Sequence, residues 1–258
     1  MSEAKILMYD EEVSPTLQWA YGVWQTNGLR TEIEPFIICF SWRWYGETKM
    51  YNERIKLNKG DVFNSVKLQA AERTVIEKLW EVLDQADIVV GHNAAGFDNK
   101  IAMGAFIRHR MKPPSDFKTV DTLRIARSVA RFNSNSLNNL CKLLGIGQKS
   151  DVKHSDVWYD YLNGSRKAAK QMVDYCNQDV DLLYTLYEKL RPFAKNHPNL
   201  NVYTGRGFAC KKCQSTKLQR RGFAYSHTSV YQAYWCKDCG AWSKDRLADK
   251  DVQRPEVV

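Results

Sequence analysis

The sequence predicts an α/β fold followed by a small cysteine-bearing module, and two observations carry this prediction. Apolar runs of strand length alternate along the chain with longer segments whose apolar residues recur every three or four positions, as they do on helices. The last fifth of the chain breaks this pattern and contains four of the seven cysteines, arranged as two CxxC pairs.

Three strands are expected before the first helix. Residues 4–10 form an apolar run that is followed by the turn signal Ser14-Pro15. Residues 34–46 and 47–57 alternate apolar and polar side chains, and Gly46 lies near the turn between them. This pattern is typical of two paired strands.

The next segment, 70–86, is expected to be an amphipathic helix. Its apolar residues Val75, Ile76, Leu79 and Leu83 follow one another at spacings of one, three and four, which places them on one helix face. Further expected elements, in order, are a buried strand at 87–93 and helices at 97–110, 119–132 with Asp121 as N-cap, 134–146, and 165–193 ended by Pro192.

Composition indicates a folded, water-soluble chain. Of the 258 residues, 44% are hydrophobic and 26% are charged, which are ordinary values for a globular protein. No apolar run approaches the roughly 18 residues that a membrane span needs, and the first residues lack the pattern of a secretory signal. We therefore expect an intracellular, cytoplasmic location and no membrane partner.

Positive charge is concentrated near the C-terminus. Residues 205–258 contain 11 Lys and Arg against 5 Asp and Glu, whereas the rest of the chain contains 27 against 24. A basic segment of this kind favours a polyanionic partner such as nucleic acid. The alternative is a basic tail that is simply solvated.

Three carboxylates crowd the end of the first predicted strand. Side chains alternate faces along a strand, so Asp10 and Glu12 point to one side and Glu11 to the other. Two carboxylates side by side suit a hard divalent cation, which offsets their repulsion. The alternative is an acidic turn that faces solvent.

A second acidic position follows the predicted strand 87–93. The stretch VVGHNAAGFDNK places a Gly-containing turn between that strand and a helix that begins near Asp98. The side chain of Asp98 is in position for a site, although an aspartate there can simply cap the helix. His92 is expected to be a hydrogen-bonded loop residue rather than a metal ligand.

A third group lies on the long helix 165–193. Tyr175 and Asp179 are four residues apart and share one helix face. Asp174 and Asp181 are alternative carboxylates, but neither has a tyrosine four residues before it. The other interpretation is that these acids form an ordinary solvated stripe.

Taken together, the three patterns resemble a known family. A strand-end DxE, an HNxxxFD loop and a late YxxxD, in this order, are similar to the DEDD superfamily of 3′-5′ exonucleases and to its tyrosine-bearing branch. The resemblance covers residues 4–193, and the stretches DTLRIAR and FNSNSLNNLCKLLGIGQK are similar to the phage and bacterial members. It implies a ribonuclease H-like mixed sheet flanked by helices.

The resemblance also implies roles for residues. Asp10, Glu12, Asp98 and Asp179 match the acids that bind two Mg²⁺ or Mn²⁺ ions, with Asp10 bridging both, Glu12 and Asp179 holding the one that carries the attacking water, and Asp98 supporting the other. Tyr175 matches the tyrosine that orients this water. Because the unperturbed pKa of tyrosine is about 10, the phenol is a poor base at neutral pH and the metal must acidify the water.

Glu11 departs from the family pattern, which usually has an apolar residue between Asp and Glu. Its side chain is expected to face the buried side of the sheet, where an ionised carboxylate is costly unless it is paired or solvated. We therefore expect the strand to fray at this point, so that Glu11 reaches water or a basic partner.

The four clustered cysteines predict a zinc site. Cys210 and Cys213 form one CxxC turn, Cys236 and Cys239 form the other, and 22 residues separate the two turns. Two such turns make a tetrahedral S₄ site suited to one structural Zn²⁺. The intervening segment 217–235 alternates as a two-stranded ribbon does, and His227 within it is not expected to be a ligand.

The ribbon carries basic and aromatic residues that favour contact with nucleic acid. Cationic side chains bind phosphates, and aromatic rings stack on unpaired bases. A protein-docking role is the main alternative, and the aromatics can also be the core of the ribbon. The basic residues are Lys217, Arg220 and Arg221, and the aromatic ones are Phe223, Tyr225, Tyr231, Tyr234 and Trp235.

These features predict a two-metal-ion 3′-5′ exonuclease that releases nucleoside 5′-monophosphates from DNA 3′ ends, with single-stranded ends preferred. A 3′-5′ exoribonuclease and a non-catalytic nucleic-acid-binding adaptor are the alternatives, and a separate polymerase or replication protein is a possible partner. The expected parts are an exonuclease domain at 1–195, a linker at 196–205, a zinc ribbon at 206–247 and a polar tail at 248–258.

Overall fold

Strand β1 (Ile6–Val13) lies at the centre of a five-stranded mixed sheet. It pairs antiparallel with β4 and parallel with β6, which leaves neither of its edges open. Helices lie against both faces of the sheet, and this explains why the first residues of β1, ILMY, are apolar and buried without alternation. In spatial order the strands are β5 (Tyr51–Arg54), β4 (Ile37–Trp44), β1, β6 (Ile88–Gly91) and β7 (Lys118–Asp121).

The computed structural model describes residues 3–22, 24, 27–150, 154–245 and 247. The chain divides into two compact units, a larger one at Lys5–Tyr187 and a C-terminal one at Glu188–Val258 that includes Met1–Ala4. The domain boundaries expected from the sequence stay predictions, and the expected polar tail at 248–258 lies outside the described residues.

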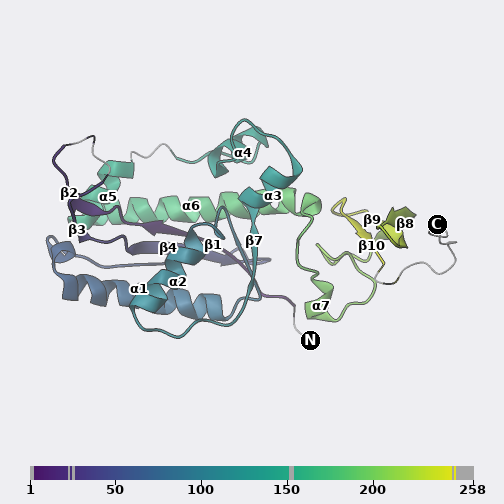
Figure 1. The fold of residues 1–258 in the computed structure, drawn as a ribbon, viewed down its shortest axis with the longest axis horizontal. Coiled ribbons are helices and arrows are strands. Elements are labelled where there is room, and N and C mark those ends of the chain that lie inside the picture. Colours follow the sequence, from purple (N-terminus) through teal and green to yellow (C-terminus); the bar gives the residue numbers. More distant parts are fainter. Residues whose placement is uncertain (1–2, 23, 25–26, 151–153, 246, 248–258) are drawn as a thin grey trace. The chain divides into compact units, whose positions relative to one another are not determined.

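Helices cover both faces of the sheet (Figure 1). On one side lie α1 (Ser65–Asp84) and α2 (Asp98–Arg108), and over the other runs α6 (Arg166–Leu190). The helix expected at 70–86 is confirmed as α1, which starts earlier because the Asn64 side chain accepts a hydrogen bond from the backbone of Lys67. The predicted α/β class is therefore confirmed.

The segment 119–132 is not helical throughout, which corrects the prediction. Residues Lys118–Asp121 form β7, which pairs parallel with β6, and helix α3 (Thr122–Val129) begins only afterwards. Asp121 is the N-cap of α3, as expected, and its carboxylate accepts from the backbone of Leu123 at 3.0 Å. The β-branched Thr119 and Val120 fit the strand better than a helix.

The remaining helices of the larger unit are short. They are η1 (Asp61–Phe63), α4 (Leu137–Leu143) and α5 (His154–Leu162). Among the described residues, no helix combines the length and the apolar character that crossing a membrane requires.

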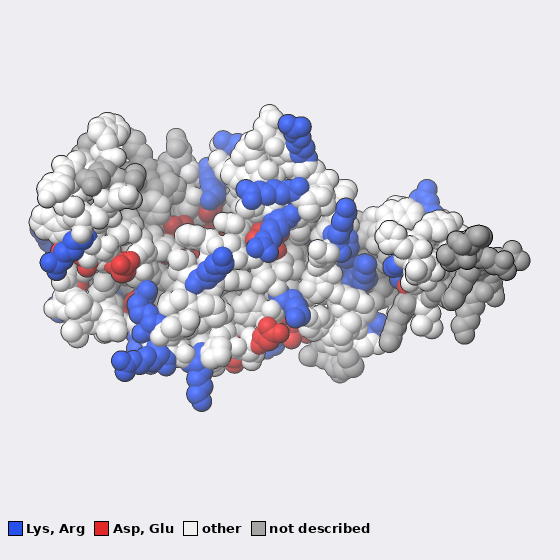
Figure 2. Space-filling view, viewed as in Figure 1, with Lys and Arg blue, Asp and Glu red and all other residues white. Residues whose placement is uncertain are grey.

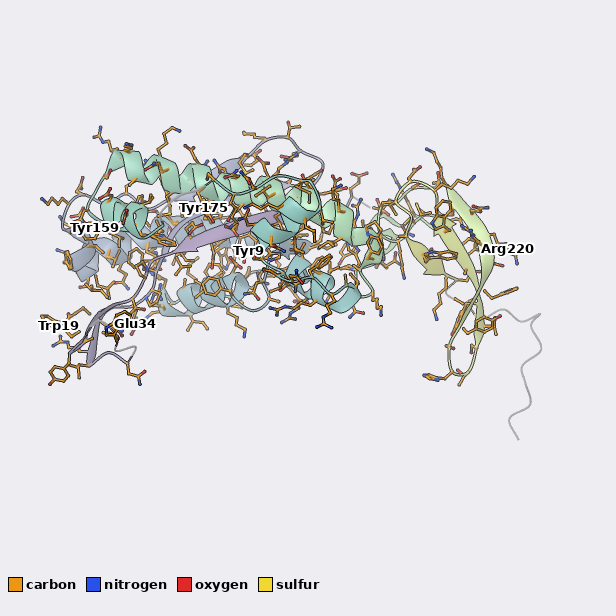
Figure 3. The ribbon with its side chains drawn as sticks, turned by 90° about the horizontal axis from the view of Figure 1, so that it is seen from above. Tyr9, Trp19, Glu34, Tyr159, Tyr175 and Arg220 are labelled. Atoms are coloured by element: carbon orange, nitrogen blue, oxygen red, sulfur yellow. The ribbon has the colours of Figure 1, made fainter. Side chains whose placement is uncertain are left out.

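A hairpin that the sequence did not predict follows β1. Its strands are β2 (Leu17–Trp19) and β3 (Arg30–Ile33), which pair antiparallel. Figure 3 shows the labelled Trp19 on this hairpin, away from Tyr9 and the central strand. Nearly all of its strand residues are exposed, so no alternation of buried and exposed positions marks it in the sequence.

The C-terminal unit contains a three-stranded antiparallel sheet in the order β10-β9-β8. The expected ribbon at 217–235 is confirmed as the pair β8 (Leu218–Tyr225) and β9 (Val230–Cys236), and β10 (Trp242–Lys244) adds a third strand. Before the sheet lie η2 (Arg191–Phe193) and the short α7 (Asn201–Thr204).

Candidate active site and cysteine cluster

Three of the predicted acids converge in the larger unit. Asp10 and Glu12 come from β1 and Asp179 from α6, and each offers a carboxylate oxygen within 4.8 Å of those of the other two. The Asp10 side chain faces α6, since one of its carboxylate oxygens lies 3.9 Å from the sulfur of Cys176. Figure 3 shows the labelled Tyr175 of α6 close to β1.

Asp98 lines the same cavity, which has a volume of about 350 Å³, but lies outside the group of three. It is the first residue of α2 and is not the cap, because Phe97 occupies the N-cap position. Its buried carboxylate is hydrogen-bonded by its own backbone and by the backbone of Glu11. The structure thus brings together elements that lie about 170 residues apart in the chain.

The loop before Asp98 is held by Asp121, a contact that the sequence did not reveal. The Asp121 carboxylate accepts from the backbone N–H groups of Asn93 at 3.0 Å and Ala95 at 3.3 Å. The loop doubles back so tightly that a Cβ atom at Gly91 would lie 2.4 Å from the Cβ of Ala94. The glycine and the acid together fix where α2 begins and hence where Asp98 lies.

His92 is a hydrogen-bonded loop residue, as the sequence predicted. One ring nitrogen lies 2.9 Å from the hydroxyl of Thr122, and the other lies 2.9 Å from the backbone oxygen of Asn135. Burial lowers the pKa of His92, so the ring is neutral at pH 7. Both nitrogens are engaged, which leaves neither available to bind a metal.

Burial and mutual repulsion raise the pKa values of the acids. The pKa of Glu12 rises to about 7 through burial and the charge of Asp179, and that of Asp98 rises to about 6 through burial. Burial, followed by the charges of Asp98, Asp179 and Glu12, raises the pKa of Asp10 well above its usual range. A buried cluster of oxygen ligands that repel one another fits a hard divalent cation.

Tyr175 lies beside Asp179, and both side chains contact Lys149. The ammonium group of Lys149 donates to the phenol oxygen of Tyr175 at 2.8 Å and also forms an ion pair with Asp179. Burial is the main reason that the pKa of Tyr175 is raised to about 12. The phenol therefore stays protonated at neutral pH.

Lys149 is a site residue that sequence reasoning missed. It lies in the loop before α5, where a single lysine carries no periodic signal. The Lys149 backbone N–H donates a hydrogen bond to the side chain of Asn138 at 2.9 Å. The Gln178 side chain of α6 donates to the backbone oxygen of Gln148 and accepts from the backbone N–H of Ser150. These contacts direct Lys149 toward the acids.

The expectation for Glu11 was wrong. The strand does not fray there, because β1 stays paired with β4 through Val13, with only a bulge between Glu12 and Val13. Glu11 is 5% exposed, and among the described residues neither of its carboxylate oxygens has a hydrogen-bond partner. Burial and then the charge of Asp98 raise the pKa of Glu11 well above its usual range.

The four predicted cysteines also come together. The sulfur of Cys210 lies 3.7 Å from that of Cys239, and the sulfur of Cys213 lies 3.6 Å from that of Cys236. Four thiolates around Zn²⁺ at about 2.3 Å stand about 3.8 Å apart, so this spacing fits a tetrahedral zinc site. The other three cysteines lie buried in the larger unit.

The two CxxC turns share one backbone pattern. In the first, the backbone of Cys210 donates to Ser215 at 2.8 Å and Gln214 has a φ of 63°. In the second, Cys236 donates to Ala241 at 2.9 Å and Gly240 has a φ of 76°. Burial opposes ionisation of Cys236, but nearby backbone N–H groups outweigh it and lower its pKa to about 7, whereas burial raises the pKa of Cys239 to about 11.

Two of the three predicted nucleic-acid contacts already have partners. Lys217 forms an ion pair with Asp238 at 3.2 Å, and the guanidinium group of Arg220 donates to Gln232. The guanidinium carbon of Arg221 lies 5.6 Å from the ring centre of Trp235 and 5.8 Å from that of Trp242. Figure 3 shows the labelled Arg220 on the outside of the β8 ribbon.

The mixed sheet flanked by helices, with a cluster of buried carboxylates beside its central strand, defines a ribonuclease H-like protein. A family model described as the RNase H superfamily matches residues 51–191, more than half of the chain, and the chain belongs to this superfamily. The matched range includes Asp98 and Asp179 but begins after β1.

One similar solved structure is the family B DNA polymerase from the hyperthermophilic archaeon Pyrobaculum calidifontis. The TM-score is 0.52 at 12% sequence identity, and the match covers 88% of this chain and 32% of the polymerase chain. This chain thus spans about a third of the polymerase length, and the similarity is one of fold. No curated protein sequence matches this chain.

Proposed function

We propose that this chain is a two-metal-ion 3′-5′ exonuclease of the tyrosine-bearing DEDD branch, acting on single-stranded DNA 3′ ends. The observation that carries the proposal is the convergence of Asp10, Glu12 and Asp179, from two separate motifs, within 4.8 Å. Asp98 from the third motif lines the same cavity. The fold of the RNase H superfamily, to which the chain belongs, supports this function.

The four acids would hold two Mg²⁺ or Mn²⁺ ions. Asp10 would contact both, Glu12 and Asp179 would complete one site, and Asp98 would complete the other. When bound, the metals supply positive charge that offsets the repulsion among the carboxylates and stabilises the charge that develops on the reacting phosphate. Raised pKa values of Glu12 and Asp98 mean that these acids give up protons as the cations bind.

Tyr175 would position the water that attacks the terminal phosphate. Its phenol has a pKa of about 12 and donates a hydrogen bond without taking the water's proton. Attack on phosphorus breaks the bond to the 3′ oxygen of the preceding nucleotide. The products are a nucleoside 5′-monophosphate and a strand that is one nucleotide shorter and ends in a 3′-hydroxyl.

The C-terminal residues would form a zinc ribbon that holds nucleic acid. Sulfur spacings of 3.6 and 3.7 Å support one structural Zn²⁺ bound by Cys210, Cys213, Cys236 and Cys239. We place the exonuclease domain at 1–195, a linker at 196–205 and the ribbon at 206–247. The similarity in fold to about a third of a family B DNA polymerase chain is compatible with DNA as substrate and with a separate polymerase as partner.

The experiment is hydrolysis of 5′-labelled single-stranded DNA and RNA with Mg²⁺ or Mn²⁺. We expect a DNA ladder that shortens from the 3′ end and disappears in Asp10→Ala and Asp179→Ala. Asp174→Ala is the matched control, because Asp174 lies on the same helix but is exposed and paired with Lys170, and it should leave the ladder unchanged.

Each other outcome points to a different function. Shortening of RNA but not of DNA would replace the proposal with a 3′-5′ exoribonuclease. Binding of both strands without any shortening, in either metal, would leave a non-catalytic adaptor. Equal loss of the ladder in Asp174→Ala would mean that the variants report misfolding rather than loss of the metal ligands.

A further inference from the structure

A cleft of about 890 Å³ lies within the C-terminal unit, and its lining residues differ from the acids of the candidate site and from Lys217, Arg220 and Arg221. One wall is the last turn of α6 with η2, and the other is formed by residues of the two CxxC turns and by Trp242 of β10. This volume is within the range of about 300–1,000 Å³ that is typical of ligand sites.

The lining of this cleft is strongly basic. Five cationic residues line it against two acids, Glu188 and Asp238, and Asp238 is already held by Lys217 at 3.2 Å and Ser215 at 2.7 Å. Among the described residues, Lys189, Lys195 and Lys211 form no ion pair. The five cationic residues are Lys189, Arg191, Lys195, Lys211 and Lys212.

These cations lie close enough to repel one another. Lys212 is 5% exposed and donates to the backbone oxygen of Pro192 at 2.6 Å, which links the first CxxC turn to η2. Burial, together with Arg191, Lys212 and Lys211, lowers the pKa of His197 to about 4. A concave surface lined by five cations and only two acids indicates a site for an anion.

The thiolates of the cysteine cluster do not account for this charge. Lys211 and Lys212 lie within the first CxxC turn, between Cys210 and Cys213. Lys189 and Lys195 belong to the opposite wall, at the end of α6 and just after η2. An anion in the cleft would neutralise both walls at once.

Two exposed aromatic rings lie in the same cleft. The side chain of Phe193 is 64% exposed and that of Trp242 is 51% exposed, although apolar rings of this size are normally buried. The guanidinium group of Arg221 lies above the Trp242 ring, so a predicted basic residue of the ribbon adjoins the cleft. Cations that meet phosphates and rings that stack on bases are the combination by which proteins bind unpaired strands.

We propose that this cleft binds a single strand of nucleic acid, with Lys189, Lys195 and Lys211 contacting phosphates and Phe193 and Trp242 stacking on bases. This inference rests on the proposed function in one respect, because the bound strand is a substrate only if the chain is an exonuclease. Binding itself needs no hydrolysis and can be measured without it.

The first test is fluorescence anisotropy of labelled oligothymidylate with the full-length, zinc-loaded Asp10→Ala chain, which leaves the strand intact. We expect the added change Lys195→Ala with Lys211→Ala to weaken binding about tenfold. The slope of log affinity against log salt should fall by about 1.4, because each lost contact to a single strand releases about 0.7 fewer counterions. Lys56→Ala with Lys112→Ala, two exposed lysines of the larger unit, is the charge-matched control.

The second test replaces Phe193 and Trp242 with alanine in the same background and compares oligothymidylate with an abasic strand. Loss of stacking should weaken binding to the bases about tenfold and leave the abasic strand nearly unchanged. Zinc content and circular dichroism establish that each variant is folded.

Equal affinity and equal salt slope in the lysine variant and its control would overturn the proposal, even if the chain degrades DNA. Loss of binding in the lysine variant, in a chain that degrades no strand, would uphold the cleft and overturn the proposed exonuclease. A folded aromatic variant that binds both strands as the parent does would overturn the assignment of Phe193 and Trp242.

Discussion

The ammonium group of Lys149 lies 2.8 Å from the phenol oxygen of Tyr175 and pairs with Asp179 on the next turn of α6. Burial works against the charged lysine, but Asp179 and the two hydrogen bonds raise the pKa of Lys149, so it stays charged. Lys149 thus supplies positive charge among acids that would otherwise repel one another.

The substitution Lys149→Met should therefore destabilise the chain when the divalent metals of the acid cluster are absent. Removing this partner from a buried carboxylate costs about 1–3 kcal/mol. Thermal unfolding at pH 8 should show a lower midpoint than the parent, and saturating Mn²⁺ should reduce the difference. Lys142→Met, at an exposed position of α4, is the control. An unchanged midpoint would show that Lys149 does not stabilise the cluster.

The raised pKa values of Glu12 and Asp98 predict a link between pH and stability. Folding raises them from 4.5 to about 7 and from 3.8 to about 6, so the folded chain binds protons that the unfolded chain releases. This contribution, on the order of 3 kcal/mol for each group, is fully present below pH 4 and is lost as pH rises through 6 to 7. Mg²⁺ should stabilise the chain more at pH 8 than at pH 5, because protons compete for the same oxygens.

Unfolding midpoints between pH 5 and pH 8, with and without Mg²⁺, test this link. Glu12→Gln with Asp98→Asn should flatten the difference between the two pH values, because the amides do not titrate. The same pH dependence in parent and double variant would assign the effect to other groups.

Glu11 predicts a stabilising substitution. Its buried carboxyl group makes no hydrogen bond among the described residues, so Glu11→Leu should raise the free energy of unfolding by about 1–3 kcal/mol. Glu11→Gln keeps a buried polar group and should gain less. Urea titration measures both changes. A less stable Glu11→Leu chain that also binds Mn²⁺ more weakly would instead make Glu11 a metal ligand.

Zinc should be required for the fold of the C-terminal unit. Small metal-bound units have little core, so binding and folding are coupled. Zinc content should fall from about one per chain to near zero in Cys210→Ser and in Cys236→Ser, with loss of near-ultraviolet dichroism from the ribbon aromatics. Cys141→Ala, a buried cysteine of α4, should keep its zinc. Full zinc content in either serine variant would refute the ligand set.

Sequence patterns located most of the strands and helices because burial follows the period of each element. The helix α1 and the pair β4–β5 were predicted from apolar spacing. The hairpin β2–β3 was missed because it is exposed, and β7 was assigned to a helix because its residues Thr119 and Val120 lie directly before a strong N-cap, Asp121. Pairing with β6, far along the chain, makes them a strand.

The sequence alone determined the chemistry of the ligands. Spacings of two on a strand, four on a helix and three in a CxxC turn are local, and backbone geometry converts them directly into neighbouring side chains. The tertiary structure alone decided what surrounds those ligands. It places Lys149 in contact with Tyr175 and Asp179, and it buries Glu11 on a strand that stays paired. It also forms a basic cleft from residues that lie far apart in the sequence. Charge and burial depend on contacts between distant segments, and no local period encodes those contacts.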